Sequence, residues 1–177
     1  QRQRVDVSPA GAPRWHAGLL LGSPHRLCFF WAGVQWLVSA GWWAAQLVGG
    51  SKGWLPQTVV PTVAWHGLWF SLGAMPLFVA GFVLTAGPRW LRTPPVDTRR
   101  LRTGVGLFSV GWLLALPATW LNVQAVAATL LLAAAGLACL VVRALAMLRQ
   151  GRRSERLHAA LITTAMGAMA LTLAAAA

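Results

Sequence analysis

The chain alternates between long apolar runs and short polar segments. The apolar runs cover residues 27–48, 62–86, 104–121, 125–148 and 158–176. Each is close to the roughly 20 residues that a helix needs to cross the hydrocarbon core of a bilayer. The connections are short, so consecutive helices should be antiparallel neighbours. The pattern therefore predicts an all-α, polytopic integral membrane helix bundle with about five transmembrane helices.

The second run combines a seam of small residues with a proline. Gly67, Ala74 and Gly81 repeat at a spacing of seven residues, which places them along one side of a helix. Small residues in such a seam let membrane helices approach closely. We therefore expect Gly67, Ala74 and Gly81 to be helix-packing positions. Pro76 lies in the middle of the same run, where it should kink the helix.

The first run carries a stripe of polar side chains. Cys28, Gln35, Ser39 and Gln46 fall on one side of a helix, because 3.6 residues make one turn. Polar groups on a membrane helix face the bundle rather than the lipid. The stripe is expected either to line a cofactor pocket or to form hydrogen bonds with neighbouring helices.

Composition and charge placement agree with a membrane protein. The chain is 57% hydrophobic, 10% charged and has a mean hydropathy of +0.60, while its formal net charge is +12. In a soluble protein this charge would suggest nucleic acid. Here the arginines lie in short segments between apolar runs, which indicates contact with lipid headgroups and no nucleic-acid partner. The expected lipid anchors are Arg89, Trp90, Arg99, Arg100, Arg102, Arg152 and Arg153.

The arginines also predict orientation and domain organisation. Nearly all basic residues fall on one side of the predicted bundle, and only Lys52 falls on the other. The positive-inside rule then places the N-terminus in the cytoplasm. Trp54 and Trp65 are expected at the outer interface. We divide the chain into a polar cytoplasmic segment (1–24) and a transmembrane domain (25–177), and its lack of an initiator methionine suggests the N-terminal part of a longer protein.

Histidines supply the candidate chemistry. An ionisable side chain on a membrane helix suggests a functional site, and His66 lies near the start of the second run. His25 precedes the first run at the opposite membrane level, so the two cannot bind the same metal ion. His16 and His158 are expected at the cytoplasmic level with His25, as solvated or interfacial residues. His66 is either a ligand or a buried packing residue. His25 is either a ligand or an anchor at the membrane surface.

Two segments resemble the NnrS family of bacterial membrane proteins. They are HRLCFFWAGVQWLVSAGWW (25–43) and WHGLWFSLGAMPLFVAGFVLTAGPRWL (65–91), of which GFVLTAGPRWL is the most specific part. The resemblance covers about half of the chain. It implies a larger inner-membrane protein that binds haem and copper and takes part in the nitric oxide response or denitrification.

The resemblance also suggests which residues bind the cofactor. The family histidines at the starts of the first two helices match His25 and His66. Some members continue the second as Trp-His-x-His-Glu-Met, whereas this chain has Leu68, Trp69 and Phe70. A second histidine and a carboxylate are therefore missing at that place, which weakens a metal site there.

The missing ligands leave a second class of function open. The chain can be a cofactor-free structural or accessory subunit that packs against other membrane protein subunits. A transporter is disfavoured, because no predicted helix contains a carboxylate for coupling to protons or cations. No combination of nucleophile, base and acid supports an enzyme reaction.

Overall fold

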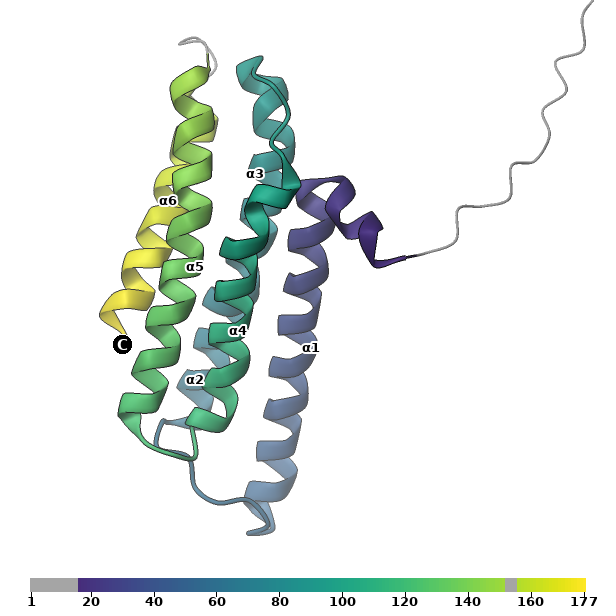
Figure 1. Ribbon diagram of the computed structural model, residues 1–177. Helices are drawn as coiled ribbons and strands as arrows, with labels where there is room; N and C mark the ends of the chain where they lie inside the picture. The colour runs from purple at the N-terminus through teal and green to yellow at the C-terminus, as the bar shows by residue number, and fades with distance from the viewer. Residues whose placement is uncertain (1–15, 152–155) are drawn as a thin grey trace, which may run out of the picture.

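The described part of the protein is a bundle of long helices (Figure 1). The computed structural model describes residues 16–151 and 156–177. The chain order is η1 (Ala17–Gly22), α1 (Pro24–Ser51), α2 (Thr62–Leu68), η2 (Trp69–Ala74), α3 (Met75–Leu91), η3 (Thr98–Leu101), α4 (Arg102–Ala118), α5 (Val123–Gln150) and α6 (Arg156–Ala175). Because α2, η2 and α3 form one continuous helix of 30 residues, the described part contains five long helices, as predicted.

Four of these helices are long and apolar enough to cross a membrane. They are Thr62–Leu91, Thr98–Ala118, Val123–Gln150 and Arg156–Ala175. The remaining helix, α1, has 28 residues and is therefore about 42 Å long at 1.5 Å per residue. Its tryptophan, glutamine and histidine side chains make it less apolar than the others. The observed helices begin and end within a few residues of the predicted runs, except that the third starts earlier, at η3.

The helix that contains Pro76, where a kink was predicted, includes a change of helix type. A π-helical segment, η2, occupies the turn and a half before this proline, and Pro76 lies in the first turn of α3. Pro76 has no backbone N–H to donate, and it stands where π-helical hydrogen bonding changes to α-helical hydrogen bonding. Gly73 is required inside η2, since a Cβ atom at this position would lie 2.3 Å from Cδ1 of Trp69. The π-helical segment thus places the Trp69 side chain over Gly73 directly before Pro76.

The closest contact between helices joins α4 and α5. A Cβ atom on Gly136 would lie 2.2 Å from the backbone nitrogen of Phe108, and one on Gly111 would lie 2.6 Å from the backbone nitrogen of Ala133. Backbone therefore packs directly against backbone, as small residues permit in membrane helices. The small-residue seam predicted from the sequence lies on the second run, and the close contact between α4 and α5 was not predicted.

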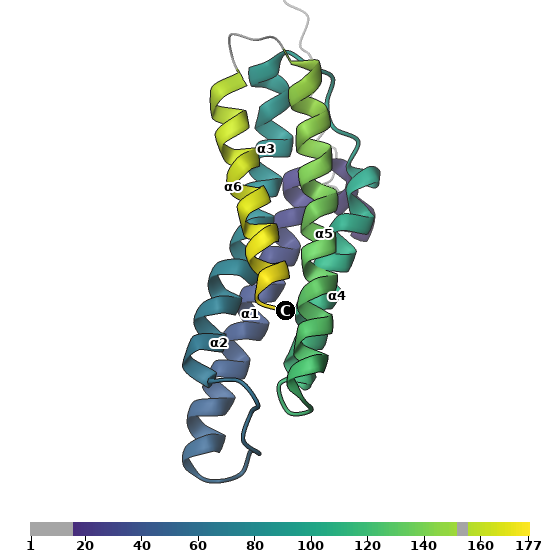
Figure 2. The same cartoon turned by 90° about the vertical axis from the view of Figure 1, so that its left-hand side faces the viewer.

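The other helices surround this pair. The helix α1 packs mainly against η2 and α3, while α6 packs against α5 and α3. Figure 2 shows that α6 ends part-way along α5. At one end of the bundle, hereafter the arginine-rich end, lie eight of the nine described arginines: Arg89, Arg92, Arg99, Arg100, Arg102, Arg143, Arg149 and Arg156.

The opposite end is closed by the loop between α1 and α2. The backbone N–H of Val59 donates to the carbonyl of Thr119 at 2.8 Å, which ties this loop to the turn between α4 and α5. Trp54 is exposed, and the ammonium group of Lys52 lies 4.4 Å from the centroid of its ring. This position suits an interfacial tryptophan. Trp65, in contrast, is buried in the core, where it packs against Trp69 and Trp112.

Of the predicted N-terminal segment, residues 1–15 lie outside the described part. The remainder forms η1, which leads into α1 through Ser23 and Pro24. Proline is favourable at the first position of a helix because its fixed φ fits the helix and its missing N–H has no partner there.

Candidate histidine sites

His66 lies half-buried between α1 and α2. Its Nδ1 atom is 3.5 Å from the hydroxyl oxygen of Ser39 on α1. Its ring stacks on Trp43, with the centroids 4.8 Å apart and the planes 9° apart. Phe70 contributes a third aromatic ring at 6.3 Å. The imidazole is therefore oriented by α1, and the described residues give its Nε2 atom no hydrogen-bond partner.

His25 occupies the first turn of α1 and contacts α3. Its backbone N–H donates to the hydroxyl oxygen of Thr85 at 3.0 Å, and its Nδ1 atom lies 3.4 Å from the same oxygen. The first amides of a helix have no partner within the helix. Thr85 therefore caps α1 from another helix. Phe29 packs edge-on against the imidazole at 5.9 Å.

One row of aromatic rings connects the two histidines. Its successive rings are His25, Phe29, Phe78, Trp36, Phe70, His66 and Trp43, with centroids 4.8–6.3 Å apart. His25 and Ser39, the neighbour of His66, are separated by 14 positions on α1. At 1.5 Å per residue this is about 21 Å. As expected, the two histidines cannot share a metal ion, and the row packs α1 against η2 and α3.

A buried polar contact holds the centre of the bundle together. Gln35 is fully buried; its Nε2 donates to the carbonyl of Ser109 at 3.1 Å, and its Oε1 accepts from the indole N–H of Trp69 at 3.0 Å. Trp69 stacks on Trp112, with centroids 5.8 Å apart. The predicted inward stripe is thus found for Cys28, Gln35 and Ser39, all buried, and Gln35 serves hydrogen bonding between helices.

The remaining titratable groups do not gather around either histidine. His16 and His158 are exposed. Among residues 16–151 and 156–177, no group of three or more His, Cys, Asp and Glu side chains is arranged to hold a metal ion. Any metal at His66 or His25 would therefore take few ligands from the described part of the chain.

Comparison with known proteins decides the family. The family model described as NnrS protein matches residues 19–177. The chain belongs to the NnrS family. No curated protein and no solved structure matches it.

In this NnrS protein, Leu68 and Trp69 are packing residues. Leu68, where the resemblance implies a second histidine in some members, packs against the hydrophobic core. Trp69, where it implies a glutamate, is fully buried and bound to Gln35. Nearby, Phe70 contacts the ring of His66. The side chains of Leu68 and Trp69 therefore pack within the bundle, and within the described residues no group of three or more metal-ligating side chains lies beside them.

The predicted packing residues of the NnrS protein divide into two groups. Ala74 and Gly81 are buried. A Cβ atom on Gly81 would lie 2.8 Å from Cβ of Cys28, so this glycine permits the approach of α1 and α3. Gly67 is exposed, and a Cβ atom there would meet nothing within 4 Å. None of the described helices packs against Gly67, so its role as a packing position stays a prediction.

The predicted lipid anchors lie mainly on the surface. Arg89, Arg99, Arg100 and Arg102 are exposed at the arginine-rich end. Trp90 is half-buried and packs edge-on against Phe82 at 5.5 Å. Arg152 and Arg153 lie outside the described residues.

Proposed function

We propose that this NnrS protein binds haem through His66 and acts in the bacterial response to nitric oxide or in denitrification. The observation that carries the proposal is the environment of the imidazole: Ser39 lies next to Nδ1, Trp43 stacks on the ring, and Nε2 has no partner among the described residues. Metal-bound histidines usually donate their other ring N–H to a neighbouring acceptor. Ser39 is suitably placed to be that acceptor.

The surroundings of His66 suit a flat apolar group. Gly67 is exposed and open above its Cα atom, while Phe70 and Trp43 supply aromatic surface. The π-helical segment η2 begins three residues after His66, and such segments are frequent at functional sites. His66 would hold the haem, Ser39 would orient the imidazole, and Trp43 and Phe70 would contact the macrocycle. Bound haem iron would supply the binding and redox chemistry for nitric oxide.

His25 is a second candidate ligand with a competing structural role. Thr85 makes contacts both to its backbone and to its ring, so anchoring α1 to α3 is a sufficient reason for this residue. Copper binding rests on the family resemblance alone. We propose a bacterial inner-membrane location with a cytoplasmic N-terminus, which the distribution of arginines supports.

Haem content tests the role of His66. The protein is purified from cells supplied with haem, and bound haem is quantified for the wild type, His66→Gly, His25→Gly and the exposed control His158→Gly. We expect haem to be lost in His66→Gly, kept in His158→Gly, and restored to His66→Gly by added imidazole, which can replace the missing ligand. Full haem content in a folded His66→Gly variant would contradict the assignment.

The alternative, a cofactor-free accessory subunit bound to other membrane proteins, makes the opposite prediction. A folded wild-type protein without haem would favour it. The residues around His66 would then serve only to pack α1 against α2.

A further inference from the structure

A polar cavity lies at the arginine-rich end, between the loop after α3 and the last turns of α5. Its volume is about 310 Å³. The polar side of its wall includes Asp97, Arg100, Arg143 and Gln150, and the loop prolines and Met147 form an apolar side. This combination of basic and apolar surface, at a helix end in a membrane protein, suits an amphiphilic ligand.

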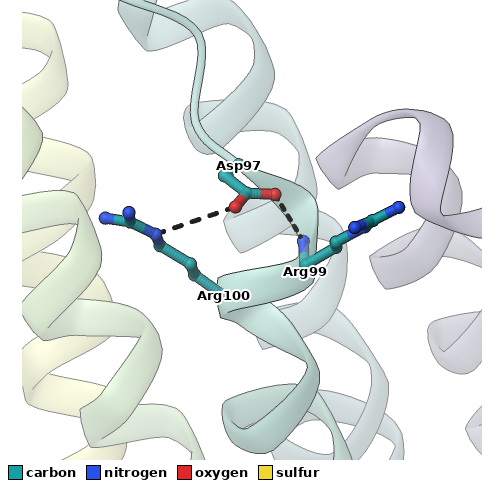
Figure 3. Close-up of polar contacts among 3 residues, drawn as sticks. All are labelled: Asp97, Arg99 and Arg100. Atoms are coloured by element: carbon teal, nitrogen blue, oxygen red, sulfur yellow. Dashed lines mark hydrogen bonds and ion pairs between the residues drawn. The ribbon is translucent and has the colours of Figure 1, made fainter.

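The charge of this cavity is positive. The Nε atom of Arg100 lies 3.7 Å from Oδ2 of Asp97. The other carboxylate oxygen of Asp97 accepts the backbone N–H of Arg99 at 3.0 Å (Figure 3). Asp97 therefore neutralises the positive charge of one guanidinium group at most. In the described residues, no carboxylate forms an ion pair with Arg143.

Arg143 lies on a part of α5 that also carries exposed apolar side chains. Arg143 precedes Gln150, the last residue of α5, by seven positions, which is about 10 Å. Its neighbours Val142 and Leu145 are exposed apolar residues, as expected for a surface in contact with lipid. A guanidinium at such a depth is costly unless it reaches a polar partner, and long arginine side chains extend toward the interface to do so.

We propose that this cavity binds the phosphate group of an anionic phospholipid. The guanidinium groups of Arg100 and Arg143 contact the phosphate oxygens, for which their planar, multiply donating geometry is suited. The acyl chains lie along the exposed apolar surface of α5 beside the cavity, which includes Val142. Basic pockets between membrane helices bind anionic headgroups in this way. The site is independent of haem binding at His66.

Native mass spectrometry of the full chain in detergent tests the site. Delipidated protein is titrated with phosphatidylglycerol and, separately, with phosphatidylcholine, diacylglycerol of the same acyl chains, and inorganic phosphate. We expect a single saturable phosphatidylglycerol adduct, with at least tenfold weaker binding of the other three. Arg143→Gln and Arg100→Gln should each weaken phosphatidylglycerol binding about tenfold, the loss of one charge-assisted contact.

Matched controls separate this site from general surface charge. Arg149→Gln on α5 and Arg102→Gln on α4 remove the same charge at the same end of the bundle, but neither residue lines the cavity. They should bind phosphatidylglycerol like the wild type. Equal losses in Arg143→Gln and Arg149→Gln would overturn the proposal.

Two further outcomes are informative. Inorganic phosphate that binds as tightly as phosphatidylglycerol, with the same dependence on both arginines, would show a site for a soluble anion and overturn the lipid assignment. If Arg143→Gln lowers the Tm, Arg143→Lys is compared with Arg149→Lys, since lysine keeps the charge but not the planar fork. Weaker binding in Arg143→Lys alone supports the site, and equal binding in the two overturns it.

Discussion

Substitution of Gly136 by alanine should weaken the contact between α4 and α5. The added Cβ atom would lie 2.2 Å from the backbone nitrogen of Phe108 and 2.7 Å from the carbonyl oxygen of Gly104. Both are backbone atoms of α4, so no side-chain rotation relieves the clash. The two helices must therefore move apart, and this separation reduces the packing of Phe108 and its neighbours, which are fully buried.

The size of the effect follows from two opposing contributions. Alanine is favoured over glycine in a helix interior by about 1 kcal/mol. Overpacking of a well-packed core costs about 1–3 kcal/mol, and a clash with backbone belongs at the upper end of that range. The expected net loss of stability is about 2 kcal/mol. For a protein of this size, this corresponds to a decrease in Tm of about 4–8 °C.

Thermal unfolding in detergent, followed by far-UV circular dichroism, measures the effect. Gly106→Ala on α4 is the matched control, because a Cβ atom there would meet nothing within 4 Å. It should leave the Tm unchanged or raise it slightly. If Gly136→Ala and Gly106→Ala had the same Tm, the backbone contact between α4 and α5 would be refuted.

Three further predictions concern the core, the helix cap and the orientation. Gln35→Met removes the hydrogen bonds to Trp69 and Ser109 and should cost about 1–2 kcal/mol; an unchanged Tm would contradict the role of this side chain. Thr85→Val removes the acceptor for the first turn of α1 and should cost about 1 kcal/mol, with faster hydrogen exchange confined to that turn; unaltered exchange would argue against capping. A cysteine at Lys52 should react with an impermeant maleimide on intact spheroplasts, and one at Arg99 only after permeabilisation; the reverse pattern would invert the proposed orientation.

The length of the apolar runs was sufficient to predict the five helices. A membrane-spanning helix must match the thickness of the bilayer. The length of each apolar run is therefore enough to predict a helix without knowledge of its neighbours in the fold. The π-helical segment was not predicted, because it reflects the fit of Trp69 over Gly73. The α4–α5 seam was missed for a similar reason: glycine marks a close approach only when the partner helix is known.

The sequence was sufficient to predict which side chains of α1 face into the bundle, but not which residues they contact. The polar stripe on α1 identified Gln35 and Ser39 as inward-facing residues, since helical periodicity is local. Their partners lie far away in sequence: Ser109 is 74 positions from Gln35, and His66 is 27 positions from Ser39. The burial of Trp65 was not predicted either, because hydropathy does not distinguish a tryptophan that packs in the core from one that is exposed.

The central claim is that His66 is a haem ligand in a nitric oxide response protein. The most direct measurement is a reduced-minus-oxidised visible spectrum of the purified protein, recorded with and without nitric oxide, for the wild type, His66→Ala and His158→Ala. We expect haem bands that shift with nitric oxide in the wild type and in His158→Ala, and the loss of these bands in His66→Ala. Unaltered bands in His66→Ala, or a featureless spectrum from folded wild-type protein, would contradict this claim.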